Sequence, residues 1–474
     1  MSALKTFDSI TSELGAGRTS CEKITQGYLN AIEEGKDLNA FLAVFPEEAL
    51  EQARAVDRKL AGGTAGTLAG MVVSIKDVIC IKDEKVTCGS KILQDFISLY
   101  DATAVARLKK ADAIVVGKTN MDEFAMGSST ENSAFGRVRL PQDESRVPGG
   151  SSGGSAVAVR AGMSTAALGT DTGGSIRQPA AFTGVLGLKP TYGRVSRYGL
   201  VAFASSLDTI GPFALCARDI ARVLQVIAGH DDHDSTSAAI PVPDYTSSLT
   251  RDIKGLRVGL PKEYYGAGLE DEIRSAIQRK VDLLRAGGAL IEEVSLPHSE
   301  YTIATYYILA TAEASSNLAR YDGARYGSRA KGARSLPEMY VKSRSEGFGP
   351  EVKRRIMLGT YVLSAGYYDA YYRKGQKVRR LIQEDFTRAF TKVDCLVTPT
   401  SPTTAFIAGE KVDDPLQMYL SDVYTTSANL AGIPGVSIPC GTDRHGLPIG
   451  LQILGRQFDE ATILKVADFL ESDS

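Results

Sequence analysis

The chain reads PGGSSGGS over residues 148–155 and GTDTGGSIR over residues 169–177, and these two runs decide the local fold. Glycine adopts backbone angles that other residues avoid, so both runs predict tight turns in which one stretch of main chain approaches another. The first run continues into AVAV at residues 156–159, which is typical of a buried helix of small residues. A flexible glycine–serine linker would not be followed by core residues. We therefore interpret both runs as turns that build a site.

Serine and lysine side chains in and near these turns could carry out acyl transfer without a histidine. A serine hydroxyl is a poor nucleophile until a neighbouring base removes its proton. Lys76 lies in an apolar stretch, residues 71–79, where burial would lower its pKa and leave a neutral amine as the base. Such a base could draw a proton through one hydroxyl of the pair Ser151 and Ser175 and so activate the other.

The second turn also predicts an oxyanion hole. A tetrahedral intermediate needs converging N–H donors, which the backbone at Thr172, Gly173 and Gly174 can present. Glycine turns before helices bind phosphate as well, so a nucleotide site is the sharpest alternative. Residues 113–119 read AIVVGKT and end like a P-loop, but the glycine that this motif requires five residues earlier is replaced by Asp112. The sequence therefore disfavours nucleotide binding there.

Composition excludes several other classes of protein. The 474 residues are 43% hydrophobic and 23% charged, as in globular proteins, and the formal net charge of −2 provides no general basic surface for nucleic acid. A basic cluster on an expected long helix favours a solvated face over an RNA contact; it comprises Lys374, Lys377, Arg379 and Arg380. No stretch approaches the roughly 18 apolar residues of a membrane span, and no signal peptide is recognisable at the start. We expect a cytoplasmic protein.

Cysteine and histidine patterns point to no metal centre. The six cysteines are scattered without C-x-x-C spacing, which predicts free thiols in a reducing compartment. His230 and His233 stand among aspartates, but proline and serine soon follow, so a polar surface loop is favoured over a metal site. His298 and His445 stand beside a strand end and a turn, and neither is expected to be catalytic.

Hydrophobic periodicity predicts a single large α/β domain with three parts: N-terminal helices at about 1–60, a catalytic core at about 65–215 and a C-terminal α/β part at about 250–474. Segments 7–59 and 300–392 are expected to be mainly helical, with shorter helices at 103–110 and from 271 to a stop at 287–288. Strands are expected at 68–78, 113–116, 254–260, 289–294, 394–397, 435–438 and 449–454. The strand, helix and strand from 254 to 294 predict a βαβ unit.

The two turns together with the run SIKD at residues 74–77 resemble the amidase signature family. That resemblance implies a mixed central sheet covered by helices on both faces. It also implies the roles within a serine, cis-serine and lysine triad. Ser175 would attack the amide, Ser151 would relay the proton after a cis Gly150–Ser151 bond, and Lys76 would be the base.

The outer segments resemble one branch of that family, the A subunits of the glutamyl-tRNA(Gln) amidotransferases. The matching runs lie at residues 312–323, 346–360, 364–372 and 428–435. This resemblance implies a glutaminase, with Arg355 as ligand of the substrate carboxylate and Asp422 as ligand of its ammonium group. Gly127 and Ser128 would touch the substrate, and Tyr306 is a weaker candidate. Without the resemblance, Arg355 and Asp422 are more typical of helix surfaces.

The same resemblance implies partners outside this chain. Ammonia would pass to a kinase-like, tRNA-binding second subunit, with a small third subunit holding the complex together, and tRNA would be bound mainly by the partner. ATP and Mg²⁺ would serve that partner, and no cofactor is implied in this chain. The acceptor could be glutamyl-tRNA(Gln), aspartyl-tRNA(Asn) or both. A free-standing amidase for other small amides and a noncatalytic scaffold protein are the alternatives.

Overall fold

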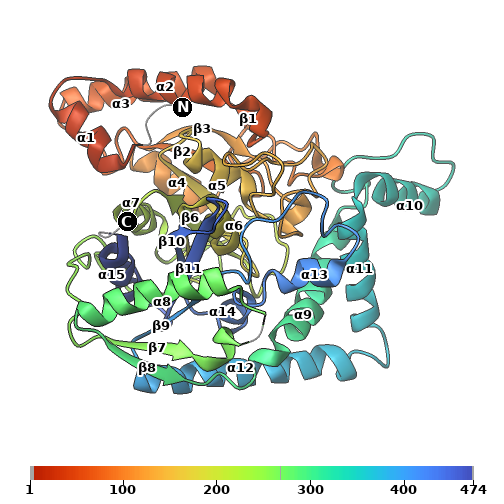
Figure 1. The fold of residues 1–474 in the computed structure, drawn as a ribbon. Helices are drawn as coiled ribbons and strands as arrows, with labels where there is room; N and C mark the ends of the chain where they lie inside the picture. Colours follow the sequence, from red (N-terminus) through yellow and green to blue (C-terminus); the bar gives the residue numbers. More distant parts are fainter. Residues whose placement is uncertain (1–4, 267, 472–474) are drawn as a thin grey trace.

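One mixed sheet crosses the computed structural model, which describes residues 5–266 and 268–471 (Figure 1). Its eleven strands lie in the order β1-β3-β2-β4-β6-β5-β10-β11-β9-β7-β8. They are β1 Phe41–Val44, β2 Val72–Lys76, β3 Ile114–Thr119, β4 Ala166–Asp171, β5 Leu186–Lys189, β6 Thr209–Ala214, β7 Arg257–Pro261, β8 Leu290–Val294, β9 Cys395–Pro399, β10 Gly435–Thr442 and β11 Pro448–Gly455. Because strands from both halves of the chain share this sheet, the fold is a single α/β domain.

The sheet mixes parallel and antiparallel pairs, as expected. β2 is parallel to β3 and β4, and β7 is parallel to β8 and β9, whereas the strands between these groups pair antiparallel. All of β2 is buried, because parallel strands are covered on both faces. β2 therefore carries Lys76, its last residue, into the interior of the protein.

Helices cover both faces of the sheet and extend beyond one side of it (Figure 1). α5 and α6 pack together on the central strands, and α7, α8 and α15 pack on the sheet as a second group. α9, α11, α12 and α14 form a further helical layer, from which α10 projects. The bounds are α1 Phe7–Gly15, α2 Cys21–Glu34, α3 Pro46–Ala61, α4 Thr103–Lys110, α5 Gly153–Arg160, α6 Arg177–Thr183, α7 Ala217–Ile227, α8 Asp271–Ala286, α9 Thr302–Asn317, α10 Leu336–Gly347, α11 Pro350–Leu363, α12 Lys374–Lys392, α13 Pro415–Leu420, α14 Thr426–Ala431 and α15 Glu460–Glu471.

Strongly periodic segments formed the predicted elements. The helix at 103–110 is α4, and the helix expected from 271 is α8, which ends before Gly287. β7 and β8, on either side of α8, pair in parallel and confirm the βαβ unit. The strand expected within 68–78 is β2, and the buried small-residue helix after the first turn is α5.

Two local predictions were incomplete. The segment 7–59, expected to be helical, also contains β1, which pairs antiparallel with the edge of β3. Strands β4, β5 and β6 were not predicted, because their glycines and small residues hide a β pattern.

The P-loop-like run at 113–119 is mostly β3, and its Lys118 is buried in an ion pair with Asp77, at 3.2 Å between Nζ and Oδ1. The lysine is therefore occupied within the core.

The basic cluster on α12 divides into two parts. Lys374, Lys377 and Arg380 are exposed, as expected of a solvated helix face. Arg379 instead turns inward and donates from Nε to the carbonyl of Leu430, at 2.9 Å. Within residues 5–266 and 268–471, no helix has both the length and the hydropathy needed to span a membrane.

Candidate active site

Lys76 projects from the end of β2 toward two neighbouring turns. Its Nζ lies 2.8 Å from Ser151 Oγ, 2.7 Å from Ser152 Oγ and 2.8 Å from Thr170 Oγ1. The turn with the two serines lies just before α5, and Thr170 lies in β4, the parallel neighbour of β2. Three elements that are distant in sequence thus converge on one amine. The Gly150–Ser151 peptide bond is cis, as the resemblance implies.

The other hydrogen bond of Ser152 limits how the hydroxyl groups around Lys76 can share their protons with the amine. Ser152 Oγ donates to the carbonyl of Thr170, at 3.1 Å, so toward Lys76 it must be an acceptor. A neutral amine has two N–H bonds and one lone pair. If it donates to Ser152 and to Thr170, its lone pair is left for the hydroxyl of Ser151. The arrangement therefore lets Lys76 accept a proton from Ser151.

Burial favours the neutral form of this amine, the form that can act as a base. It lowers the pKa of Lys76 to about 7, while the negative charges of Asp122, Asp171 and Asp208 act in the opposite direction. A substantial fraction of Lys76 is then neutral near pH 7, as general base catalysis requires.

Ser175 follows β4 at the second turn and is 8% exposed, more than the fully buried Ser151. Ser152 N–H donates to the carbonyl of Ser175, at 3.3 Å, which ties the two turns together. Gly174 has φ of 135°, a conformation that L side chains rarely adopt, and a Cβ at Gly174 would overlap Thr425 Oγ1. Only glycine fits at this position, so the conformation of the turn that presents Ser175 depends on Gly174.

The expected oxyanion hole is partly engaged in internal contacts. Gly174 N–H donates to Asp171 Oδ1, at 2.9 Å. The N–H groups of Gly173 and Ser175 have no acceptor among the residues that the structure describes. Assignment of the oxyanion donors to Thr172, Gly173 and Gly174 stays a prediction, and the free N–H of Ser175 adds a further candidate donor.

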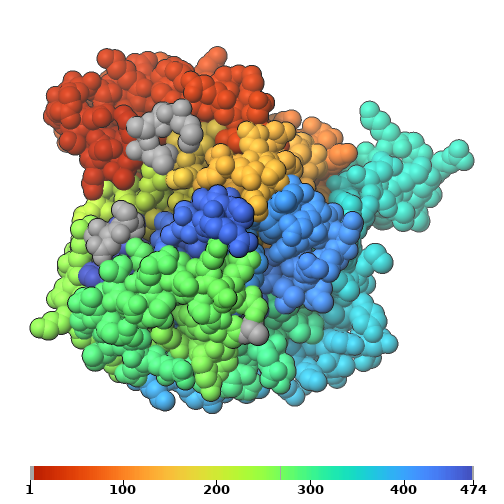
Figure 2. All heavy atoms as spheres, viewed as in Figure 1, coloured from red at the N-terminus to blue at the C-terminus, as the bar shows by residue number. Residues whose placement is uncertain are grey.

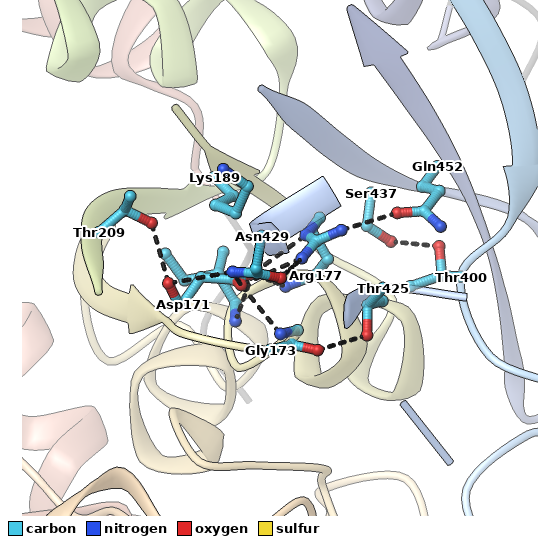
Figure 3. Close-up of polar contacts among 12 residues, drawn as sticks. Asp171, Gly173, Arg177, Lys189, Thr209, Thr400, Thr425, Asn429, Ser437 and Gln452 are labelled. Carbon is cyan, nitrogen blue, oxygen red and sulfur yellow. Dashed lines mark hydrogen bonds and ion pairs between the residues drawn. The ribbon is translucent and has the colours of Figure 1, made fainter. Parts of the chain in front are cut away.

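A buried polar network lies behind the turn that carries Ser175 (Figure 3). Arg177 donates from Nε to Asp171 Oδ2 at 3.0 Å and from Nη2 to Asn429 Oδ1 at 2.7 Å, and its Nη1 reaches Gln452 Oε1 at 3.1 Å. Burial alone would raise the pKa of Asp171, but the charge and hydrogen bonds of Arg177 hold it at about 2. The ionised pair thus fixes the turn between β4 and α6. On the other side of the turn, Thr425 Oγ1 donates to the carbonyl of Gly173, at 2.6 Å.

Arg355, on α11, is a buried cation rather than a surface residue. It is 3% exposed, and its guanidinium carbon lies 5.2 Å from the ring centre of Tyr307 and 5.5 Å from that of Tyr419. Its Nε donates to Glu351 Oε1, at 2.8 Å. Its two terminal nitrogens make no hydrogen bond with any residue in 5–266 or 268–471, so the planar fork is free for a ligand.

Asp422 is likewise buried, between α13 and α14. Ser128 Oγ donates to its Oδ2 at 2.5 Å, whereas its Oδ1 accepts no hydrogen bond from the described part of the chain. Burial raises the pKa of Asp422 to about 7, although the hydrogen bond from Ser128 and the charge of Arg355 act to lower it. Asp422 is thus close enough to Arg355 for the two charges to interact.

The remaining candidates, Tyr306 and Gly127, lie beside the Ser175 turn and beside Arg355, respectively. The ring of Tyr306 occupies the space that a Cβ at Gly173 would need. Gly127 and Arg355 both line a cavity of about 130 Å³, several times the roughly 30 Å³ that one water occupies in the liquid.

Figure 2 shows the blue segment around 405–420 beside the yellow-orange surface of residues 130–150. Gly409 N–H donates there to Glu131 Oε1, at 2.7 Å.

The family model named Amidase matches residues 23–464. This chain belongs to the amidase family. It is therefore an amidase-type enzyme, and the resemblance inferred from its two turns and SIKD run is confirmed.

The relatives of this amidase include A subunits of amidotransferases and a peptide amidase. The glutamyl-tRNA(Gln) amidotransferase A subunit of Koribacter versatilis (strain Ellin345) is 56% identical over 468 residues, which cover 98% of each chain. The solved structure of the protein of the same name from Thermotoga maritima has a TM-score of 0.80 and 43% identity, over 96% of this chain and 92% of that one. The native peptide amidase of Stenotrophomonas maltophilia has a TM-score of 0.82 and 32% identity, over 99% of this chain and 97% of its own.

Some polar residues of this amidase site were not found by sequence reasoning. Ser152 and Thr170 contact Lys76 but stand inside the quoted turns without a pattern of their own. Gln178, on α6, accepts from Gly150 N–H at 2.9 Å and donates to the carbonyl of Ser128 at 2.8 Å. Its position three residues after Ser175 was the only available signal.

The residues set aside from the sequence stay outside this amidase site. In the hydrogen bonds of the described structure, His230 and His233 contact a nearby carbonyl and the aspartates of their own loop, and their side chains are 47% and 67% exposed. Among the described residues, no group of three or more His, Cys, Asp or Glu side chains could hold a metal ion.

Proposed function

We propose that this amidase is the glutaminase subunit, the A subunit, of a glutamyl-tRNA(Gln) amidotransferase. One observation carries the proposal: a buried arginine fork and a buried carboxylate oxygen, both without a full set of partners, lie together beside the nucleophile turn. Free glutamine carries an α-carboxylate for Arg355 and an α-ammonium for Asp422. A simple amide has neither group and would leave both charges unused.

In the proposed reaction, Ser175 Oγ attacks the side-chain carboxamide carbon of glutamine. Its proton passes to Ser151, and the Ser151 proton passes to the neutral amine of Lys76. Backbone N–H groups at residues 172–175 stabilise the oxyanion. The C–N bond breaks, and the nitrogen takes a proton back from Ser151 and Lys76 as it leaves as ammonia. A water molecule, activated by the same pair, then hydrolyses the Ser175 ester and releases glutamate.

Ammonia from this site would serve a second subunit. That kinase-like partner would bind tRNA and use ATP and Mg²⁺ to phosphorylate glutamyl-tRNA(Gln), or aspartyl-tRNA(Asn), before amidation, and a small third subunit would hold the complex together. This chain needs no cofactor of its own because serine and lysine supply the nucleophile, relay and base. Since its proposed acceptor is an aminoacyl-tRNA, we expect it to work in the cytoplasm. The names of its relatives support the proposal.

The test is ammonia release from glutamine, asparagine and butanamide by the protein purified from its own host, with Ser175→Ala as the inactive control. Glutamine-selective release that rises with co-purifying subunits, ATP and glutamyl-tRNA is the expected result. Similar rates on all three amides, indifferent to tRNA, would replace the proposal with a free-standing amidase. Equal activity of the Ser175→Ala protein would contradict the assigned nucleophile.

A further inference from the structure

Asp122 is a fully buried acid that the proposed reaction does not use. It follows β3, and its carboxylate accepts two backbone hydrogen bonds, from Thr130 N–H to Oδ2 at 2.9 Å and from Asn132 N–H to Oδ1 at 3.1 Å. Both donors belong to the segment that begins at Gly127, which lines the same cavity as Arg355. Asp122 therefore holds this cavity wall in place.

The other side of Asp122 faces the relay serine. Its own N–H donates to the carbonyl of Ser151, at 3.2 Å. A Cβ at Gly150 would overlap Asp122 Oδ2, and a Cβ at Gly127 would overlap its Cγ. Both glycines are thus required by the carboxylate that lies between them. One side chain fills the space between the cis turn and the cavity wall.

A second contact joins the same two segments. Thr130, whose N–H is held by Asp122, donates from Oγ1 to the carbonyl of Gly149 at 2.7 Å and accepts from Gly153 N–H at 3.1 Å. The turn around Ser151 is therefore held at both of its ends by a residue that Asp122 positions. A shift of the carboxylate would move the relay serine and the cavity wall together.

Asp122 also interacts with the base through its charge. Of the acidic groups that act on Lys76, Asp122 has the largest effect, ahead of Asp171, Asp208 and the Cys88 thiol. Burial raises the pKa of Asp122 itself to about 6, opposed by its two backbone hydrogen bonds and by Lys76, while Glu131 acts to raise it. Base and acid thus lose their protons over neighbouring pH ranges.

We propose that Asp122 is a positioning residue of the serine–lysine site, which fixes the relay turn to the cavity wall and stabilises the ammonium of Lys76 once it holds the proton. The inference rests on the proposed Ser151 and Lys76 relay. It is independent of which amide or acceptor the enzyme uses. A group with a purely structural role would affect folding or rate, but it would not change the pH at which Lys76 becomes a base.

The test measures covalent labelling of Ser175 by a fluorophosphonate, a probe that reacts with activated serines, from pH 5 to pH 9 in the purified full chain with its co-purifying subunits. Asp122→Asn keeps the shape and removes the charge. Labelling should then begin at a pH lower by about one unit or more, because Lys76 loses the charge that favours its protonation. Its maximal rate should fall about tenfold as the relay turn loosens. We call the rise in labelling rate between pH 5 and neutral pH the acidic limb of the labelling profile. If this limb lies at the same pH in Asp122→Asn as in the parent, the proposal is overturned.

Asp112→Asn is the matched control. Asp112 is also buried, accepts from Lys59 Nζ at 2.5 Å and from Gly66 N–H at 2.7 Å, and lies at the opposite end of β3. Its substitution removes a buried carboxylate without touching the site, so the labelling profile should match the parent. A limb that moves equally in Asp112→Asn would show a general effect of charge loss and would overturn the assignment to Asp122.

Asp122→Glu tests position separately, also if Asp122→Asn does not fold. It keeps the charge but adds a methylene where Gly127 and Gly150 leave no room, so labelling should slow at least about tenfold with the acidic limb in place. Labelling at the parent rate would overturn the positioning role. A parent protein that leaves Ser175 unlabelled would overturn the serine–lysine mechanism and this inference together. Normal parent labelling with an unmoved limb in Asp122→Asn would overturn the inference alone.

Discussion

Replacing Arg355 with alanine should reduce kcat/KM for glutamine about 150-fold and leave kcat/KM for butanamide within about threefold of the parent. Butanamide is glutamine without its α-carboxylate and α-ammonium groups, so it reacts at the same carbon but offers nothing to Arg355. Comparison of the two substrates separates lost recognition from lost structure. If Arg355 binds the carboxylate equally strongly in the ground state and in the transition state, its loss should appear mainly as a higher KM.

The magnitude follows from the free end of the guanidinium. Its two terminal nitrogens have no partner among the described residues, so the fork can make two charge-assisted hydrogen bonds to a carboxylate. Each is worth roughly 1.5–3 kcal/mol, and because the pair acts as a unit we take about 3 kcal/mol for both. Since 1.4 kcal/mol corresponds to a factor of ten, this amounts to the expected loss of about 150-fold.

Loss of Arg355 also removes a partner from Glu351, so stability must be measured beside activity. Glu351 keeps the hydroxyl of Tyr419, at 3.1 Å, and the guanidinium of Arg354, so we expect a cost of about 1–3 kcal/mol rather than the full cost of an unpaired buried charge. Thermal unfolding measures this loss of stability. Lys353→Ala, an exposed change on the same helix, is the control and should leave both substrates unaffected.

Ammonia release in coupled assays gives kcat/KM for both substrates. Equal losses for glutamine and butanamide would show that Arg355 supports the fold of the site and does not bind the carboxylate. A glutamine value unchanged from the parent would remove Arg355 from the pocket altogether. Either result would refute the reasoning, because both contradict a free fork aimed at a carboxylate.

Three further predictions concern titration, the relay and the nucleophile turn. Lys76 must lose a proton to act as base and Asp422 must lose one to bind ammonium, and each has a pKa of about 7. Below pH 7, a plot of log kcat/KM against pH should therefore rise with a slope about one unit steeper for glutamine than for butanamide. Equal slopes would exclude Asp422 as the ammonium ligand. Ser152→Ala, which removes one acceptor of the lysine amine, should lower kcat about tenfold at unchanged KM in steady-state assays, and an unchanged kcat would contradict its role. Gly174→Ala places a Cβ against Thr425 at a φ of 135° and should lose more than about 100-fold in ammonia release, whereas a near-normal rate would show that the turn can relax.

The fold was predictable where a segment carries its own period. α8 shows one apolar face and a glycine stop, and β2 is a short apolar run between turns, so both could be located from the sequence. β4 could not, because its residues AALGTD carry no alternation and its pairing with β6 is set by close backbone packing. β1 is only four residues long and depends on the edge of β3 for its hydrogen bonds.

The catalytic site was predictable to the extent that its chemistry is concentrated in short motifs. Lys76, Ser151 and Ser175 stand in distinctive runs, and the structure brings the amine of Lys76 to Ser151 as expected. Asp122 and Gln178 could not be assigned, because each acts through backbone groups of a neighbouring loop or turn rather than through a motif of its own. Such contacts depend on the relative placement of strands and turns, which no local pattern encodes.

Glycine makes this site possible, and the same property requires rigid support around it. Two glycine turns allow main chains to approach closely, but glycine brings no side chain to hold them and loses the most conformational freedom on folding. The chain supplies that support from both sides with buried polar groups: Asp171 and Arg177 lie behind the Ser175 turn, and Asp122 and Gln178 lie around the Ser151 turn. Burying a charge costs several kcal/mol unless its partners are complete, so each group is tolerated only while the turns keep their shape. Conversely, the turns keep their shape only while these groups are in place, and geometry and stability at this site therefore depend on the same residues.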